Sequence, residues 1–205
     1  PTLNPASLWR VLREDRNYAL FMLCMFVIGT GNIMLTAPLT LTLADQFHLD
    51  ALASMVITSA LPYLVFPWLI PFWSRLLSRR HVVRFRVIHS WVFVVSQAVV
   101  LLAAVSNTLE LMYISAMFQG IAFAGGSLAW NLGHLDFAPP HRASQYMGVH
   151  VTLNGVRGLL APILAVSLYQ ALGSWRPGGE HWVFAFSVVL CIAGALGFGR
   201  LAVLM

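Results

Sequence analysis

Three polar side chains stand close together in a stretch of the chain that is otherwise apolar. His150, Asn154 and Arg157 are spaced four and three residues apart within residues 143–171. In an α-helix these spacings place all three side chains on one face. An imidazole, an amide and a guanidinium arranged in this way can bind an anionic group and exchange a proton.

Arg157 is the most informative of the three. From Ala143, the predicted start of this helix, it lies about 14 residues inward, which is roughly 21 Å along a helix. If the helix spans a bilayer, a guanidinium at that depth is costly unless it faces a cavity or a partner. Two interpretations stay open: a packing clamp on carbonyl oxygens exposed by a kink at Pro162, or a ligand-binding group. The shared face with Asn154 and His150 favours ligand binding and makes His150 a candidate for proton coupling.

Two other apolar stretches carry polar groups near their middles. Asn32 and Thr36 lie one helical turn apart, and Gln119 precedes Trp130 on one predicted helix face. Amide and hydroxyl groups in such positions also bond across helices, so ligand contact and helix packing both stay open. The predicted substrate-binding residues are Arg157, Asn154, Asn32, Gln119, Thr36 and Trp130.

Composition decides what kind of protein positions these residues. Of the 205 residues, 59% are hydrophobic and only 9% are charged. A soluble domain needs roughly 25% charged residues to cover its surface. The chain is therefore predicted to be an integral membrane protein whose outer surface faces lipid.

The charged residues exclude several other classes of protein. All twelve cations are arginines, giving a net charge of +5, and they cluster at the ends of apolar runs. That distribution is typical of arginines that contact lipid headgroups and determine the orientation of a membrane protein, rather than of a nucleic-acid-binding surface. Cys24 and Cys191 lie inside apolar runs and fit neither a disulfide framework nor a zinc site. No metal and no cofactor is predicted.

Six apolar stretches are long enough to span a bilayer as helices. They cover about residues 18–43, 51–73, 87–105, 109–135, 143–171 and 182–204. Residues 1–17 are predicted to be a cytoplasmic linker, either an amphipathic segment lying on the membrane or a plain lead-in, and residues 18–205 the transmembrane domain. The chain shows no cleavable signal peptide and does not begin with Met, so we expect residue 1 not to be the start of the gene product.

The arginines predict the orientation. Under the positive-inside rule, the side of the membrane richer in arginine is cytoplasmic. Ten arginines fall in the terminal segments and the loops after the second and fourth helices, whereas only Arg176 falls on the other side. Both termini are thus predicted to be cytoplasmic, in an inner or plasma membrane. The ten are Arg10, Arg13, Arg16, Arg75, Arg79, Arg80, Arg84, Arg86, Arg142 and Arg200.

Three short motifs carry a resemblance to a known family. Ser74 to Arg84 is similar to a Gly-x-Leu-Ala-Asp-Arg loop with a basic run, although serines replace the glycine and the aspartate. Gln119-Gly120 resembles the fourth-helix pattern Arg-x-x-Gln-Gly, with Ala116 in place of the arginine. Pro139 to Arg142, followed by Gly148, is similar to a Pro-x-x-Arg…Gly pattern before the fifth helix.

In this order and spacing, the motifs resemble one six-helix half of a major facilitator superfamily transporter, and the C-terminal half more than the N-terminal half. The resemblance implies an all-α transmembrane bundle of two inverted three-helix repeats. It implies that the first and fourth helices line a cavity. The second and fifth would meet a second six-helix half, in the same chain or a partner subunit, and the third and sixth would face lipid.

The function that follows is secondary transport of a small solute by alternating access, and a buried Arg157 favours an anionic one. At the predicted cytoplasmic face, Asp136 is expected to pair with an arginine of the loop after the second helix and so latch a gate; a solvated charge is the alternative. The gate residues are Asp136, Arg79, Arg80, Arg84 and Arg142.

Two other functions stay open. The substituted motifs also fit a transport-inactive scaffold or assembly subunit of a membrane complex. A membrane oxidoreductase could hold haem between paired imidazoles, for which the candidates are His89, His134, His150 and His48. No nucleophile–base pair, phosphate loop or metal-ligand spacing is present in the sequence, so no enzyme activity is predicted.

Overall fold

A computed structural model describes residues 5–205, which are helical with short turns and contain no strand. Within this range six helical segments are long and apolar enough to cross a bilayer, as predicted from the sequence. In chain order the elements are α1 (Pro5–Glu14), α2 (Arg16–Asp45), α3 (Ala51–Met55), η1 (Val56–Ala60), α4 (Leu61–Ser78), α5 (Val82–Ser106), α6 (Leu109–Leu132), η2 (Gly133–Asp136), η3 (Pro140–Arg142), α7 (Ala143–Trp175), η4 (Gly179–His181) and α8 (Trp182–Leu204).

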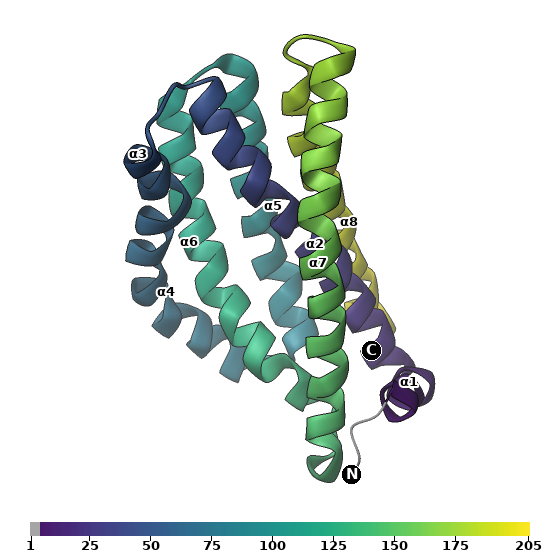
Figure 1. Ribbon diagram of the computed structural model, residues 1–205. Helices are drawn as coiled ribbons and strands as arrows, with labels where there is room; N and C mark the ends of the chain where they lie inside the picture. The colour runs from purple at the N-terminus through teal and green to yellow at the C-terminus, as the bar shows by residue number, and fades with distance from the viewer. Residues whose placement is uncertain (1–4) are drawn as a thin grey trace.

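The long helices run side by side in one bundle (Figure 1). Helix α2 packs against α7 and α8, α5 packs against α6 and α8, and α4 packs against α6. Small residues allow the α2–α8 pair to approach closely. A Cβ atom at Gly194 would lie only 2.7 Å from the Cβ of Ile28, so this crossing accepts no larger side chain without movement.

The second membrane-capable segment is continuous but irregular. Its α3 and α4 portions are joined by η1, a π-helical turn that ends two residues before Pro62. A proline inside a helix lacks the N–H group and crowds the carbonyl of the preceding turn. Widening that turn relieves the crowding, which explains why the irregularity lies here.

Helix α5 begins at Val82, five residues before the predicted start at residue 87. Two side chains cap its first turn: Asp136 Oδ2 accepts from the Val82 amide at 2.6 Å, and His81 Nδ1 accepts from the Val83 amide at 3.2 Å. Arg86 therefore does not lie in the loop, as the orientation count assumed, but inside the helix, and it is only 4% exposed.

Helix α1 lies beside the first turns of α2 and α7 (Figure 1). Arg142 forms a salt bridge to Glu14 with an N–O distance of 2.8 Å. Tyr146 donates its hydroxyl to Asp15 at 2.9 Å, while Tyr18 donates to the Tyr146 carbonyl at 2.6 Å. The amphipathic segment is thus a helix tied to α7; residues 1–4 of the predicted linker lie outside the described part of the chain.

Candidate functional site

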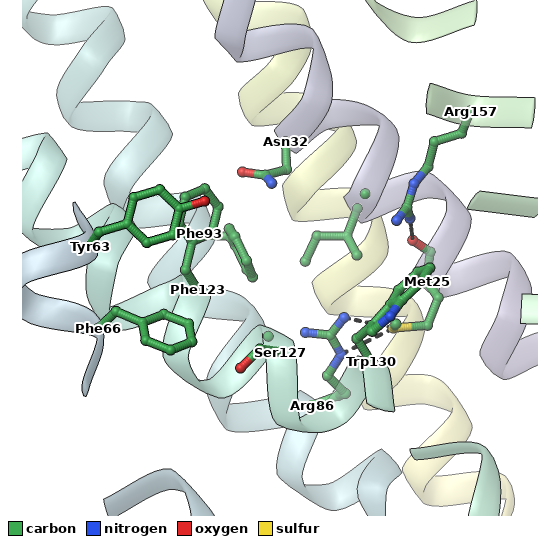
Figure 2. Close-up of a pocket in the computed structure, with 13 residues that line it drawn as sticks. Met25, Asn32, Tyr63, Phe66, Arg86, Phe93, Phe123, Ser127, Trp130 and Arg157 are labelled. Atoms are coloured by element: carbon green, nitrogen blue, oxygen red, sulfur yellow. Dashed lines mark hydrogen bonds between the residues drawn. The ribbon is translucent and has the colours of Figure 1, made fainter. Parts of the chain in front are cut away.

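One cavity of about 370 Å³ lies between α2, α4, α5, α6 and α7. Figure 2 shows the side chains that line it. This volume falls within the range of about 300–1,000 Å³ that small-molecule sites occupy. The lining residues are Met25, Ile28, Gly29, Asn32, Tyr63, Phe66, Arg86, Phe93, Phe123, Gly126, Ser127, Trp130 and Arg157.

Arg157 reaches this cavity from α7. Its Nη1 donates to the Met25 carbonyl oxygen at 2.7 Å, and its Nη2 donates to Asn154 Oδ1. Its buried Nε has no hydrogen-bond partner. A Cβ atom at Gly29 would overlap the guanidinium group, so the absence of a side chain there makes room for Arg157.

Arg86 reaches the same region from α5. Its Nε and Nη2 donate to the Met25 sulfur at 3.2 and 2.6 Å, and its Nη1 contacts His89 Nδ1 at 3.0 Å. Figure 2 shows Arg86 and Arg157 directed toward Met25 from two different helices. Two guanidinium groups therefore converge on one methionine at the cavity wall.

His89 fixes the position of Arg86. Its Nε2 lies 2.9 Å from the Ala122 carbonyl oxygen, and because that oxygen can only accept, Nε2 carries the proton. Nδ1 is then left as the acceptor for Arg86. The close approach of the imidazole depends on Gly125, where a Cβ atom would clash with the ring.

Neither the buried Arg86 nor the half-buried Arg157 has an acidic partner among the described residues. Among residues 5–205 the structure contains one salt bridge, the Arg142–Glu14 pair described above. Arg86 and Arg157 donate only to a thioether, an imidazole, an amide and a carbonyl group, and a thioether is a weak acceptor. A charge that is removed from water without a counter-charge is costly, so these two arginines are the unusual feature of the cavity.

An amide network orients Asn32, which lines the cavity from α2. Gln119 Nε2 donates to Asn32 Oδ1 at 2.8 Å, and Ser96 donates to Gln119 Oε1 at 2.8 Å. With its oxygen engaged, Asn32 presents its Nδ2 amide group as a donor. Gln119 itself lines a separate small cavity of about 40 Å³ together with Thr36.

Trp130 and His150 form a pair at the cavity edge. Their ring centroids lie 3.8 Å apart in an edge-on arrangement, with Trp130 in the lining and His150 behind it. His150 is 2% exposed, and neither of its ring nitrogens has a hydrogen-bond partner. A change in the protonation of this imidazole would therefore first affect Trp130, the ring that it contacts.

The predicted gate residues lie near the α4–α5 turn and the start of α7. Asp136, Arg79 and Arg80 line one surface cleft, in which Asp136 accepts from the Val82 amide. Within the described residues it forms no salt bridge with an arginine. The gate latch therefore stays a prediction.

The structure brings most of the predicted site residues to one cavity and adds others. Arg157, Asn32 and Trp130 line it, Asn154 and His150 lie directly behind, and Thr36 and Gln119 face the smaller neighbouring cavity.

The important residue that the sequence interpretation missed is Arg86. Its spacing to His89 and Phe93, three and seven residues, is typical of one helix face and could have revealed it.

One of three comparisons with known proteins identifies a family for this chain. A family model described as Major Facilitator Superfamily matches residues 21–204, which extend from the second turn of α2 to the end of α8. No curated protein and no solved structure matches the chain. Six membrane-capable helices fit one six-helix half of a transporter of this superfamily. The chain is a multi-pass membrane protein and belongs to the Major Facilitator Superfamily of transporters.

Proposed function

We propose that this chain forms half of a secondary transporter that moves a small anionic solute. The observation that carries the proposal is the pair of arginines, Arg86 and Arg157, which face one cavity without an acidic partner in residues 5–205. A carboxylate can accept two hydrogen bonds from a guanidinium, and such charge-assisted bonds are among the strongest in proteins. The solute would supply the counter-charge that the protein lacks.

The polar groups of the cavity would divide the work of binding. Arg157 lines the cavity and would supply a positive charge, and Arg86 can exchange its weak bonds to the Met25 sulfur for bonds to the solute. Asn32 would donate from its free amide group to a second oxygen. Asn154 would act as a positioning residue because it holds the Arg157 guanidinium from the same helix.

A second six-helix unit would close the cavity. In α4 and α7 the membrane-spanning windows are the least buried of the six segments. Both expose large apolar side chains, among them Trp68 at 79% and Leu159 at 67%. Because apolar side chains on every spanning helix can face lipid, the support for a partner half, in the same chain or in another subunit, is the low burial of these two helices beside the cavity.

Alternating access would then expose the cavity to one side of the membrane at a time. His150 is the proton-coupling candidate because its unpartnered imidazole touches Trp130 in the cavity wall. Asp136 and the arginines of the α4–α5 turn would form the cytoplasmic gate in another conformation, in which Asp136 gives up its bond to Val82.

The other two hypotheses have less support. A scaffold without transport activity would not need a cavity lined by two arginines without an acidic partner in residues 5–205. Among the haem candidates, both nitrogens of His89 are occupied, one by Arg86 and one by the Ala122 carbonyl. His48 lies in the loop between α2 and α3, away from the cavity residues.

An uptake experiment tests this proposal. The full-length gene product is reconstituted in proteoliposomes, and uptake is measured for labelled acetate, succinate and benzoate, for neutral glycerol and for cationic choline. We expect saturable uptake of at least one carboxylate and none of glycerol or choline. Uptake of choline or glycerol without any carboxylate would overturn the proposal, and so would no uptake of any of the five solutes.

Gly29→Ala provides a more local test. The added methyl group occupies the position of the Arg157 guanidinium, which must move because it is the flexible partner. We expect about tenfold weaker carboxylate uptake, the value of one charge-assisted bond, with an unchanged amount of folded protein. The matched control is Gly199→Ala, where a Cβ atom meets nothing within 4 Å. Equal loss in both variants would contradict the assigned role of Gly29.

A further inference from the structure

The cavity has two chemically different sides. The arginines and Met25 form one side, whereas Tyr63 and Phe66 of α4, Phe93 of α5 and Phe123 of α6 gather on the other (Figure 2). These four aromatic rings come from three consecutive helices of the chain, α4, α5 and α6. The cavity therefore pairs a cationic end, where Trp130 also lies, with an end formed by these four rings.

This division limits what can bind. The lining contains no carboxylate, and its polar groups besides the arginines are the Asn32 amide, the hydroxyls of Ser127 and Tyr63 and the indole N–H of Trp130. A strongly hydrated anion such as sulfate would lose water against the aromatic side without gaining donors there. An amino acid would bring an ammonium group for which the lining has no acidic partner.

The size of the cavity agrees with a ring-bearing solute. A dry cavity of about 150 Å³ lined by apolar side chains is large enough to bind benzene. The cavity here, at about 370 Å³, has room for one aromatic ring and a carboxylate together. Aromatic rings pack favourably in offset or edge-to-face arrangements, which the rings on three different helices can supply.

Building on the proposed function, we propose that the solute is a monoanion with a flat apolar body, of the aromatic carboxylate class. Its carboxylate lies between Arg86 and Arg157, and its ring lies against Phe66, Phe93 and Phe123. Asn32, oriented by Gln119, donates to a carboxylate oxygen. The aromatic side thus determines specificity, and the cationic side provides the charge requirement.

Binding to the purified full-length protein tests this inference by isothermal titration with four probes: benzoate, acetate, benzyl alcohol and phenylalanine. We expect benzoate to bind about tenfold or more tightly than acetate, because burial of the ring adds apolar contact. Benzyl alcohol lacks the charge and phenylalanine adds an ammonium group, so both should bind at least about tenfold more weakly than benzoate.

Variants of the aromatic side complete the test. Phe123→Ala should weaken benzoate binding about three- to tenfold and leave acetate binding unchanged. Phe66→Ala, at a partly buried position, should have the same effect and serves if Phe123→Ala does not fold. The matched control is Phe186→Ala, a side chain of α8 that is 51% exposed and outside the cavity.

The outcomes separate the two proposals. If acetate and benzoate bind equally well and neither aromatic variant changes benzoate affinity, the proposal of an aromatic carboxylate is wrong, whereas the proposal of an anion site is retained. If benzyl alcohol binds as well as benzoate, or if neither carboxylate binds, the anionic site itself is wrong and both proposals fall.

Discussion

Arg86→Gln lowers the affinity for benzoate by about ten- to a hundredfold, because one charge-assisted hydrogen-bonded contact is lost. The same substitution leaves the thermal midpoint of the unliganded protein within about 4 °C of wild type. The Arg86 side chain donates to the Met25 thioether and contacts His89, and the substitution removes these bonds. It also removes a buried cation that has no counter-charge, and this gain in stability offsets the loss of the bonds. Titration and thermal unfolding of the purified protein measure both quantities.

Arg86→Lys is the informative companion. Lysine keeps the positive charge but lacks the planar guanidinium, to which a carboxylate can bind through two hydrogen bonds. The affinity of this variant for benzoate should therefore lie between those of wild type and Arg86→Gln. The control is Arg176→Gln, an exposed arginine of the turn between α7 and α8. A fall in thermal midpoint with unchanged benzoate affinity would show that Arg86 only supports packing.

Arg157→Ala abolishes carboxylate uptake in proteoliposomes while the protein still inserts and remains folded. Arg157 donates to the Met25 carbonyl and to Asn154, and it lines the cavity. Loss of these donors removes half of the cationic side, which corresponds to about a hundredfold or more in binding.

A comparison with Asn154→Ala separates binding from positioning. Asn154 holds the guanidinium without lining the cavity, so its removal should weaken uptake about three- to tenfold and leave some activity. Uptake at the wild-type rate in Arg157→Ala would refute the anion site and would leave the packing clamp as the role of Arg157.

The sequence was sufficient to predict the six helices, because their apolar length is a bulk property of each segment. The proximity of Arg157 and Asn154 was also predictable, because two polar residues three positions apart in one helix lie on the same face. Inverted repeats and the cytoplasmic location of the termini stay predictions.

Arg86 could not be placed from hydropathy, because the boundary of α5 depends on a tertiary contact. Asp136, 54 residues further along the chain, caps the first turn of the helix and extends it to Val82. Two arginines assigned to the loop, Arg84 and Arg86, therefore belong to α5, and Arg86 is buried there. As a result α5, expected to face lipid, supplies Arg86 and Phe93 to the cavity.

Gln119 shows a second limit of the sequence. Its place on an inward helix face was predictable, but the direction of its amide depends on Asn32 and Ser96, which belong to other helices. The polar group that faces the cavity is consequently Asn32, and Gln119 acts behind it.

Arg86 and Arg157 are proposed to bind an anion in the cavity. Introducing a carboxylate side chain into the cavity tests this proposal most directly. Ser127 lines the cavity, and its hydroxyl donates only to the Ala124 carbonyl of its own helix. Ser127→Asp places a carboxylate in the same cavity as Arg86 and Arg157, and Ser127→Asn is the neutral control of the same shape. Benzoate affinity, measured by titration, should fall at least about tenfold in Ser127→Asp and stay within about threefold in Ser127→Asn. Wild-type affinity in Ser127→Asp, or an equal loss in both variants, would contradict the claim.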